Sequence, residues 1–250
     1  MIPEMPTLFF EIHDGLPRQG PGSFDSTAKA FGMITDLPER PRILDLGCGP
    51  GMQTLALAKL TDAEIIAVDT YQPFLDQLSR KAQAEGVADR IQPLNADMHR
   101  LTFPAESFDL IWAEGSIYLM GFAKGLEKWK RFLKNGSYLA VSEVSWLRDD
   151  PPEEIRRFWN TEYPQIQTIG ANLEVIVETG YESIGYFVLP SSDWWEHYYE
   201  PIAQRLENFR RKYAGSPQDL EIIAMEQNEI EMYRKYSDSY GYVFYVMRMR

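Results

Sequence analysis

The chain has few of the residues that build disulfides and metal sites. Cys48 is the lone cysteine among 250 residues, which excludes an internal disulfide. The three histidines are scattered and have no cysteine partners, so no zinc-type spacing exists and we expect no metal. This composition suits a reducing, cytoplasmic compartment.

The chain also lacks long apolar runs and an excess of positive charge. No run of 18 apolar residues occurs, and residues 1–11 do not combine a basic start with an apolar run, so neither a membrane span nor a secretion signal is expected. The 25 basic and 37 acidic residues give a net charge of −12, which repels phosphate backbones and anionic membranes. We therefore expect a small-molecule partner and no nucleic acid.

What the chain does have is an apolar run at residues 42–46 that leads into Gly47, Gly49 and Gly51 and then into a helical stretch. Glycines let the backbone approach a ligand, and the helix that follows presents unpaired N–H groups. This pattern predicts a cradle for a nucleotide-like cofactor. The dinucleotide motif G-x-G-x-x-G would need a glycine where Met52 stands, which disfavours a nicotinamide oxidoreductase.

An acidic residue, Asp45, stands two positions before Gly47, so the run reads D-x-G-x-G-x-G. Here the chain resembles the class I S-adenosylmethionine (SAM)-dependent methyltransferases, most of all the type 11, ubiquinone/menaquinone-biosynthesis-like family. The resemblance covers residues 41–144 well and the final strands weakly. It implies a doubly wound α/β fold with a mostly parallel, seven-stranded, Rossmann-like sheet whose last strand is antiparallel. It also implies SAM as cofactor and S-adenosylhomocysteine (SAH) as product, held around Asp45, Gly47, Cys48, Gly49 and Gly51.

Two further strands end in acids. Residues 64–69 predict a second buried strand ending at Asp69, where a carboxylate can accept both ribose hydroxyls of an adenosine; a helix cap is the alternative, and both roles can hold. Thr70 would line the same rim. A third strand ends at Asp97, and in the resembled family an acid here accepts from the adenine amino group while the next N–H, that of Met98, meets the ring. A simple turn at Asp97 is the alternative.

Residues 1–22 carry four prolines and predict an irregular arm that ends in a turn. A helix should follow from a Ser23 N-cap to about Leu37. In the resembled methyltransferases such elements often lie over the SAM pocket, and Arg18 and Gln19 would then reach the methionine carboxylate. A solvated surface turn is the equally open alternative.

Catalytic groups are expected where the fourth and fifth strands end. Glu114, which ends the fourth strand, and Tyr118, which follows it, lie at the edge where the methyl group should be, so they would face either the methionine moiety of SAM, which makes Glu114 a candidate cofactor-binding residue, or the acceptor. Glu114 can instead cap the next helix. If the acceptor must lose a proton, His197 is the first candidate base because it titrates near neutrality, and Tyr118, Glu114 and Glu143 follow. A histidine that only hydrogen-bonds within the fold is the alternative.

About fifty residues separate the sixth strand from the last one, too many for a hairpin loop. They predict a helical cap, with helices at residues 201–213 and from Pro217 onward. Most aromatic residues of this region should pack as a cap, while a few would wall a pocket for a flat or cationic acceptor. The candidates for that wall are Trp146, Trp159, Tyr163, Trp194, Trp195 and Tyr198.

The sequence thus predicts one α/β unit in four segments: an arm with a lid helix (1–40), the SAM-binding core (41–189), the cap insertion (190–239) and the final strand (240–250). The expected function is in-line methyl transfer from SAM to a small molecule. The alternative is a SAM-binding protein without methyl transfer, either a regulatory module or an enzyme that modifies SAM itself. The sequence leaves the choice between a monomer and a homodimer open.

Overall fold

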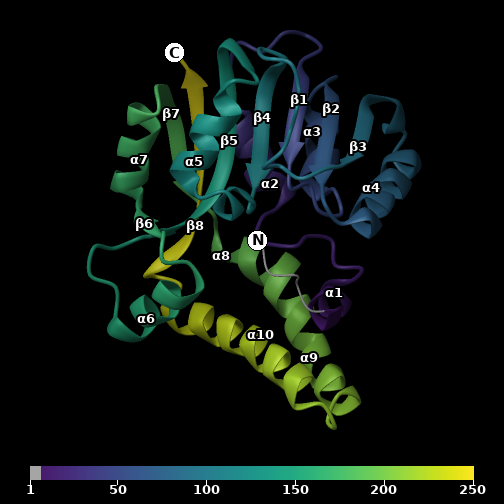
Figure 1. Ribbon diagram of the computed structural model, residues 1–250, viewed down its shortest axis with the longest axis vertical. Helices are drawn as coiled ribbons and strands as arrows, with labels where there is room; N and C mark the ends of the chain where they lie inside the picture. The colour runs from purple at the N-terminus through teal and green to yellow at the C-terminus, as the bar shows by residue number, and fades with distance from the viewer. Residues whose placement is uncertain (1–6) are drawn as a thin grey trace.

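The apolar runs of the middle of the chain form a parallel sheet. The computed structural model describes residues 7–250, and Figure 1 shows a twisted sheet at its centre. Five strands run parallel and are mostly buried, because helices cover both of their faces. These strands are β1 (Arg42–Leu46), β2 (Glu64–Asp69), β3 (Ile91–Asn95), β4 (Phe108–Glu114) and β5 (Leu133–Trp146).

Beyond β5 the sheet becomes antiparallel. β8 (Tyr240–Met249) pairs in the antiparallel sense with β5 and with β7 (Tyr181–Val188), which gives the order β3-β2-β1-β4-β5-β8-β7. A two-residue strand, β6 (Gln167–Thr168), pairs with the end of β5 and adds an eighth strand to the predicted seven. The predicted fold class is confirmed. The strand order reverses between β1 and β4, and ligands of such sheets bind beyond the carboxyl ends of the strands there.

Helices fill two cores, one on each face of the sheet. One core includes α2 (Phe24–Phe31), α3 (Met52–Leu60) and α4 (Gln72–Ala84), and the other includes α5 (Phe122–Lys130) and α7 (Ile169–Glu178). Short 3₁₀ turns connect elements at Ala88–Arg90 and Ile117–Leu119.

A third core lies beside the carboxyl ends of the strands, where the cap packs. Figure 1 shows α9 (Glu200–Lys212) and α10 (Pro217–Tyr236) below the sheet. Buried aromatic and aliphatic residues join these helices to α1 (Thr7–His13), α6 (Glu153–Glu162), α8 (Ser191–Trp194) and a π-helical turn, Trp195–Tyr199. Within residues 7–250, no helix is both long enough and apolar enough to cross a membrane.

Three predicted boundaries are wrong. The arm is not irregular throughout, because α1 lies within it; residues 1–6 are outside the described part. α2 begins after the predicted Ser23 cap but ends at Phe31, where Gly32 closes it by donating to Ala28 O, instead of reaching Leu37. The apolar positions Leu126, Trp129 and Leu133 predict a helix from Phe122 to Leu133 that stops at Asn135–Gly136. α5 instead ends at Lys130, because Leu133 pairs with β4 and starts β5, which also contains Asn135–Gly136.

We predict that Gly51→Ala destabilises the fold more than Gly86→Ala. Both glycines have positive φ, 91° and 71°, so each alanine adds strain of about 1–2 kcal/mol. A β-carbon at Gly51 would also collide with the buried Leu78, at a further cost of roughly 1–3 kcal/mol, whereas one at Gly86 meets no atom within 4 Å. Urea unfolding of the two variants measures the difference, and equal losses would contradict the close packing of Gly51.

Candidate functional site

The glycine loop after β1 is a rigid turn. Gly47 has a φ of 71° and Gly49 of 51°, in the region where glycine alone is free of strain. The N–H groups of Gly47 and Cys48 both donate to Val68 O, at 2.9 and 3.0 Å. A β-carbon at Gly47 would collide with the side chain of Ser116, which follows β4. The loop is therefore held closely between the ends of β2 and β4.

Asp69, at the end of β2, fastens the loop from the neighbouring strand. Its Oδ2 accepts from Gly49 N–H and its Oδ1 from Tyr71 N–H, both at 2.9 Å. Burial raises the pKa of Asp69, and these backbone donors oppose the rise. A carboxylate has about four acceptor sites, so Asp69 can still accept from hydroxyl groups of a ligand. The neighbouring Thr70 is exposed on the same rim.

Asp45 lies beneath the loop. It is fully buried, accepts from Thr54 Oγ1 at 2.6 Å, and its Oδ1 has no partner within residues 7–250. Burial raises the pKa of Asp45 to about 7, while the Thr54 hydrogen bond opposes this rise. These contacts make Asp45 a support that joins β1 to α3.

Arg18 and Gln19 lie where the sequence predicted a lid. Arg18 forms a buried ion pair with Glu114 at the end of β4. Gln19 lies beside Gly49, where an added β-carbon would stand 3.5 Å from Gln19 Cγ. Its Nε2 donates to His13 O, and its buried Oε1 has no partner among the described residues. Gln19 thus brings an unused acceptor to the glycine loop.

The carboxylate of Glu114 is fully engaged by the protein. Besides Arg18 it accepts from Thr27 Oγ1 at 2.7 Å and from Trp112 Nε1 at 2.9 Å, and its side chain is 3% exposed. These contacts give Glu114 a structural role, and the helix cap weighed from the sequence is absent, since Gly121 precedes α5. A role as base stays a prediction that the contacts do not support.

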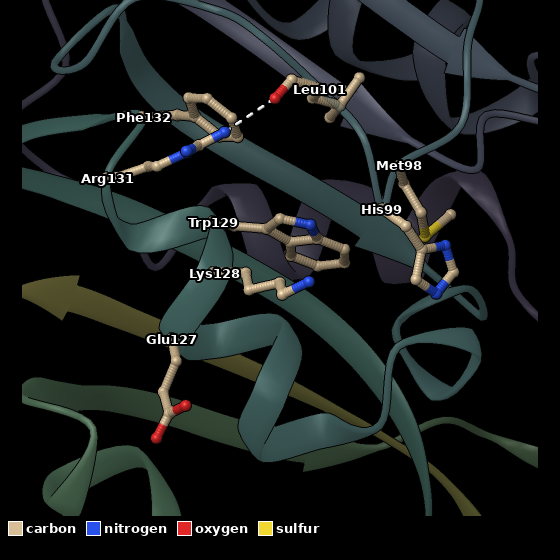
Figure 2. A pocket seen from close by; sticks show the side chains of 8 residues that line it. All are labelled: Met98, His99, Leu101, Glu127, Lys128, Trp129, Arg131 and Phe132. Atoms are coloured by element: carbon tan, nitrogen blue, oxygen red, sulfur yellow. Dashed lines mark hydrogen bonds between the residues drawn. The ribbon is translucent and has the colours of Figure 1, made fainter.

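Asp97 and Met98 lie just after β3, beside a hollow of about 260 Å³. Asp97 accepts from the backbone N–H of His99 at 2.8 Å, a contact that lowers the pKa of the carboxyl. Figure 2 shows Met98 and His99 on one side of the hollow and Trp129 of α5 opposite. The buried Nε1 of Trp129 has no partner within residues 7–250. The hollow therefore opens beside the predicted adenine site.

Glu143 and Tyr163 meet at the end of β5. Glu143 is 1% exposed and burial raises its pKa to about 8, a rise that the Tyr163 phenol partly opposes. The Tyr163 ring lies edge-on to Tyr118, with centroids 6.0 Å apart. Tyr118 follows β4, and Glu143 lies near the end of β5. The structure thus brings Tyr118, Tyr163 and Glu143, three residues that the sequence nominated, to neighbouring strand ends.

The cap residues divide into packed and half-buried groups. Trp194 is 2% exposed and stacks on Tyr233 with centroids 4.1 Å apart, which indicates packing. Tyr198 is also buried, and Trp146, Trp159 and Trp195 are half-buried beside the same core. His197 lies half-buried in the π-helical turn and makes no described hydrogen bond, so its role as base stays a prediction.

Several polar residues at this edge gave no sequence signal. His13 of α1 is fully buried, and its Nε2 lies 3.2 Å from Glu226 Oε1 of α10. Glu229, one turn further along α10, accepts from Tyr199 at 2.9 Å. Their partners lie 213 and 30 residues away in the chain, so local spacing cannot reveal them. An i, i+3 pair of glutamates on a mostly amphipathic helix was the only available sign.

The strand order and the glycine loop at the carboxyl ends define the fold of the class I methyltransferases. The SAM-dependent methyltransferase from Geobacter sulfurreducens, solved with SAH, superposes with a TM-score of 0.84 at 19% identity, over 99% of both chains. YjhP from E. coli gives the same TM-score at 20% identity, over 98% of this chain and 100% of that one. These likenesses concern the fold.

Residues 43–136 match the family described as Methyltransferase domain, which confirms the predicted resemblance to the class I SAM-dependent methyltransferases. The chain is 25% identical over 202 residues to sterol 24-C-methyltransferase erg6 of Aspergillus fumigatus, covering 75% of this chain and 51% of the relative. It is 29% identical over 132 residues to methyltransferase GfsG of Streptomyces halstedii, covering 50% and 48%. The chain spans about half the length of these curated relatives.

We predict that Arg18→Met lowers the free energy of unfolding by about 3 kcal/mol, because it leaves Glu114 charged and buried without its cation. The double variant Arg18→Met with Glu114→Gln should recover part of this loss. Lys59→Met is the control, since its pair with Glu85 is half exposed and should cost less than about 1 kcal/mol. Urea unfolding measures all three, and a loss no larger than that of the control would show that the pair is dispensable.

We predict a pH dependence that belongs to Glu143. Its folded pKa of about 8 lies above the ordinary 4.5, so the folded state holds the proton more tightly and this stability is lost as pH rises from about 5 through 8. Relative to Glu143→Gln, the native protein should lose on the order of 3 kcal/mol over that range. Asp45 is present in both proteins, so its contribution to the pH dependence cancels in the comparison. Unfolding at pH 5, 6.5 and 8 provides the test, and parallel curves would mean that Glu143 is ionised throughout.

Proposed function

We propose that this protein is a SAM-dependent methyltransferase that acts on a small molecule. The observation that carries the proposal is the rigid glycine loop with Asp69 fastened to Gly49 N–H at the carboxyl edge of the sheet. The methyltransferase domain match and the SAH-bound Geobacter sulfurreducens neighbour support the choice of cofactor.

The residues around the loop fit SAM. Ser116 and Leu78 stand where β-carbons of Gly47 and Gly51 would lie, so these glycines let the loop pack closely at the strand ends. The orphaned Gln19 Oε1 beside Gly49 offers an acceptor for the ammonium of the methionine moiety, and Asp69 offers acceptors for ribose hydroxyls. When bound, SAM supplies a methyl group on a positively charged sulfur, which needs little activation.

The chain's own part in the reaction is to orient two ligands and to exclude water. Arg18 ties the N-terminal arm to Glu114, which keeps the segment with Gln19 over the glycine loop. Phe10 of α1 stacks on Tyr71 after β2, with centroids 4.3 Å apart, and extends this cover. Holding the acceptor in line with the methyl group inside such a cover contributes more to the reaction rate than acid–base chemistry does.

The acceptor side of the proposal rests on the aromatic residues of the third core. Tyr118, Tyr163 and Trp159 lie near the ends of β4 and β5, and they belong to different elements that converge there. We propose that they wall the acceptor. Modification of SAM itself is not favoured, because the cap arginine that comes near the arm, Arg205, donates to Ile12 O and Asp14 O.

Calorimetric titration with SAM, SAH and NADH tests this function. We expect micromolar binding of both sulfur ligands and none of NADH. Asp69→Asn should weaken SAH binding about 10- to 100-fold, because charged acceptors contribute about 1.5–3 kcal/mol per hydrogen bond. Asp89→Asn, at an exposed acid of the same type, is the matched control and should bind normally. Binding of NADH without SAH would rule out the proposal.

A further inference from the structure

Polar atoms without partners gather where the cap meets the sheet. Glu143 is 1% exposed, and its Oε2 has no hydrogen-bond partner within residues 7–250. The Tyr240 hydroxyl, which is 0% exposed, also has none. The Tyr163 hydroxyl has none within 3.5 Å, although it lies close enough to Glu143 to lower the pKa of that carboxyl. A buried polar atom without a partner is destabilising, because it has lost its hydrogen bonds to water. Three of them in one region point to a ligand that completes their hydrogen bonds.

Helix α10 brings a second carboxyl group to this region. Glu229 accepts from Tyr199 Oη at 2.9 Å, and burial, followed by the charge of Glu226, raises the pKa of Glu229 to about 7. In the described part of the chain, no ion pair within 4.0 Å includes Glu143 or Glu229. Glu143 is thus buried and Glu229 half-buried, each without an ion-pair partner.

Two tyrosines connect the carboxyls. Burial, and then the charges of Glu229 and Glu143, raise the pKa of Tyr118, although 40% of its surface is exposed. Burial, Tyr118 and the same two carboxyls also raise the pKa of Tyr242. The Tyr242 hydroxyl lies 3.9 Å from where a β-carbon of Gly115 would stand, at the end of β4.

We propose that Glu143 and Glu229, with the tyrosines around them, form the acceptor site and that the acceptor is a small organic cation, an amine that is protonated in water. This inference rests on the proposed function. Two carboxyls give the cation its counter-charge, and phenol oxygens and aromatic faces stabilise positive charge in a desolvated place. An anionic acceptor would meet two acids without ion-pair partners, whereas the basic side chains at this edge, Arg18 and His13, already contact Glu114 and Glu226.

A bound cation also resolves the cost of the buried acids. Without a partner, burial raises the pKa of each acid, and a positive charge within about 4–6 Å favours the ionised form. Of the groups near the two acids, some raise the pKa of the acid and others lower it. Those acting on Glu143 and its surroundings are Tyr163, Tyr118 and Tyr242, and those acting on Glu229 are Tyr199, Glu226 and Glu162.

For a protonated amine the reaction balances with Glu143 as proton acceptor. The bound ammonium gives an N–H proton to the Glu143 carboxylate, which frees the nitrogen lone pair. The nitrogen then forms a bond to the methyl carbon, while the carbon–sulfur bond breaks and its electron pair remains on sulfur. The products are SAH and the methylated ammonium ion, and Glu143 later returns its proton to water.

Binding to the SAH-saturated protein tests the proposal with cations and their neutral counterparts. The probes are choline against 3,3-dimethylbutan-1-ol, and benzylamine against benzyl alcohol, titrated by calorimetry at pH 8. We expect at least one cation to bind tenfold or more tightly than its neutral counterpart. Glu143→Gln and Glu229→Gln should each weaken that cation at least tenfold and leave the neutral probe unchanged.

Glu221→Gln is the matched control, because Glu221 is an exposed acid on the same helix as Glu229 and makes no described contact. It should bind both probes as the native protein does, and all three variants should keep native SAH affinity, which shows that they fold. If SAH binds but the neutral probes match both cations, or if neither cation binds at millimolar concentration, the cation site is refuted and the methyltransferase proposal stands. If SAH itself fails to bind, the proposed function falls and the acceptor assignment falls with it.

Discussion

The buried ion pair between Arg18 and Glu114 is the constraint on which the active edge of this protein depends. Both side chains are less than 5% exposed, so each charge is stabilised chiefly by the other. Glu114 ends β4, and Arg18 belongs to the arm that precedes the sheet in the chain. The pair therefore holds the arm across the carboxyl edge, because any other placement would leave a charge buried alone.

The arm and α2 in turn hold the cap in place. Ser26 Oγ, just after the Ser23 N-cap of α2, donates to Asp193 Oδ2 at 2.5 Å, and Gly22 N–H donates to Asp193 O. At the other end of the arm, His13 contacts Glu226 of α10. The cap insertion is thus attached to the sheet edge through the N-terminal segment, which explains how a fifty-residue insertion keeps a defined place.

Sequence reasoning recovered the core and the glycine loop because their signals are local. Continuous apolar runs bounded by glycine or acid identify buried parallel strands, and Asp69 stands at a fixed distance from Gly51. The end of α5 was misjudged for the opposite reason. Residues around Leu133 have the apolar spacing of a helix, and only pairing with Phe108 on β4 draws them into a strand. The two-residue β6 had no pattern to read at all.

The sequence by itself determined the class of fold and the position of the cofactor loop, since strand, glycine turn and helix are properties of contiguous residues. Tertiary structure alone decided the roles of single side chains. Glu114 had the appearance of a catalytic acid, but Arg18, 96 residues away, occupies it. Glu229 had the appearance of a solvated helix residue, but the fold places it beside Tyr199 and desolvates it. Burial and partner choice depend on contacts between distant segments, and these exist only once the chain has folded.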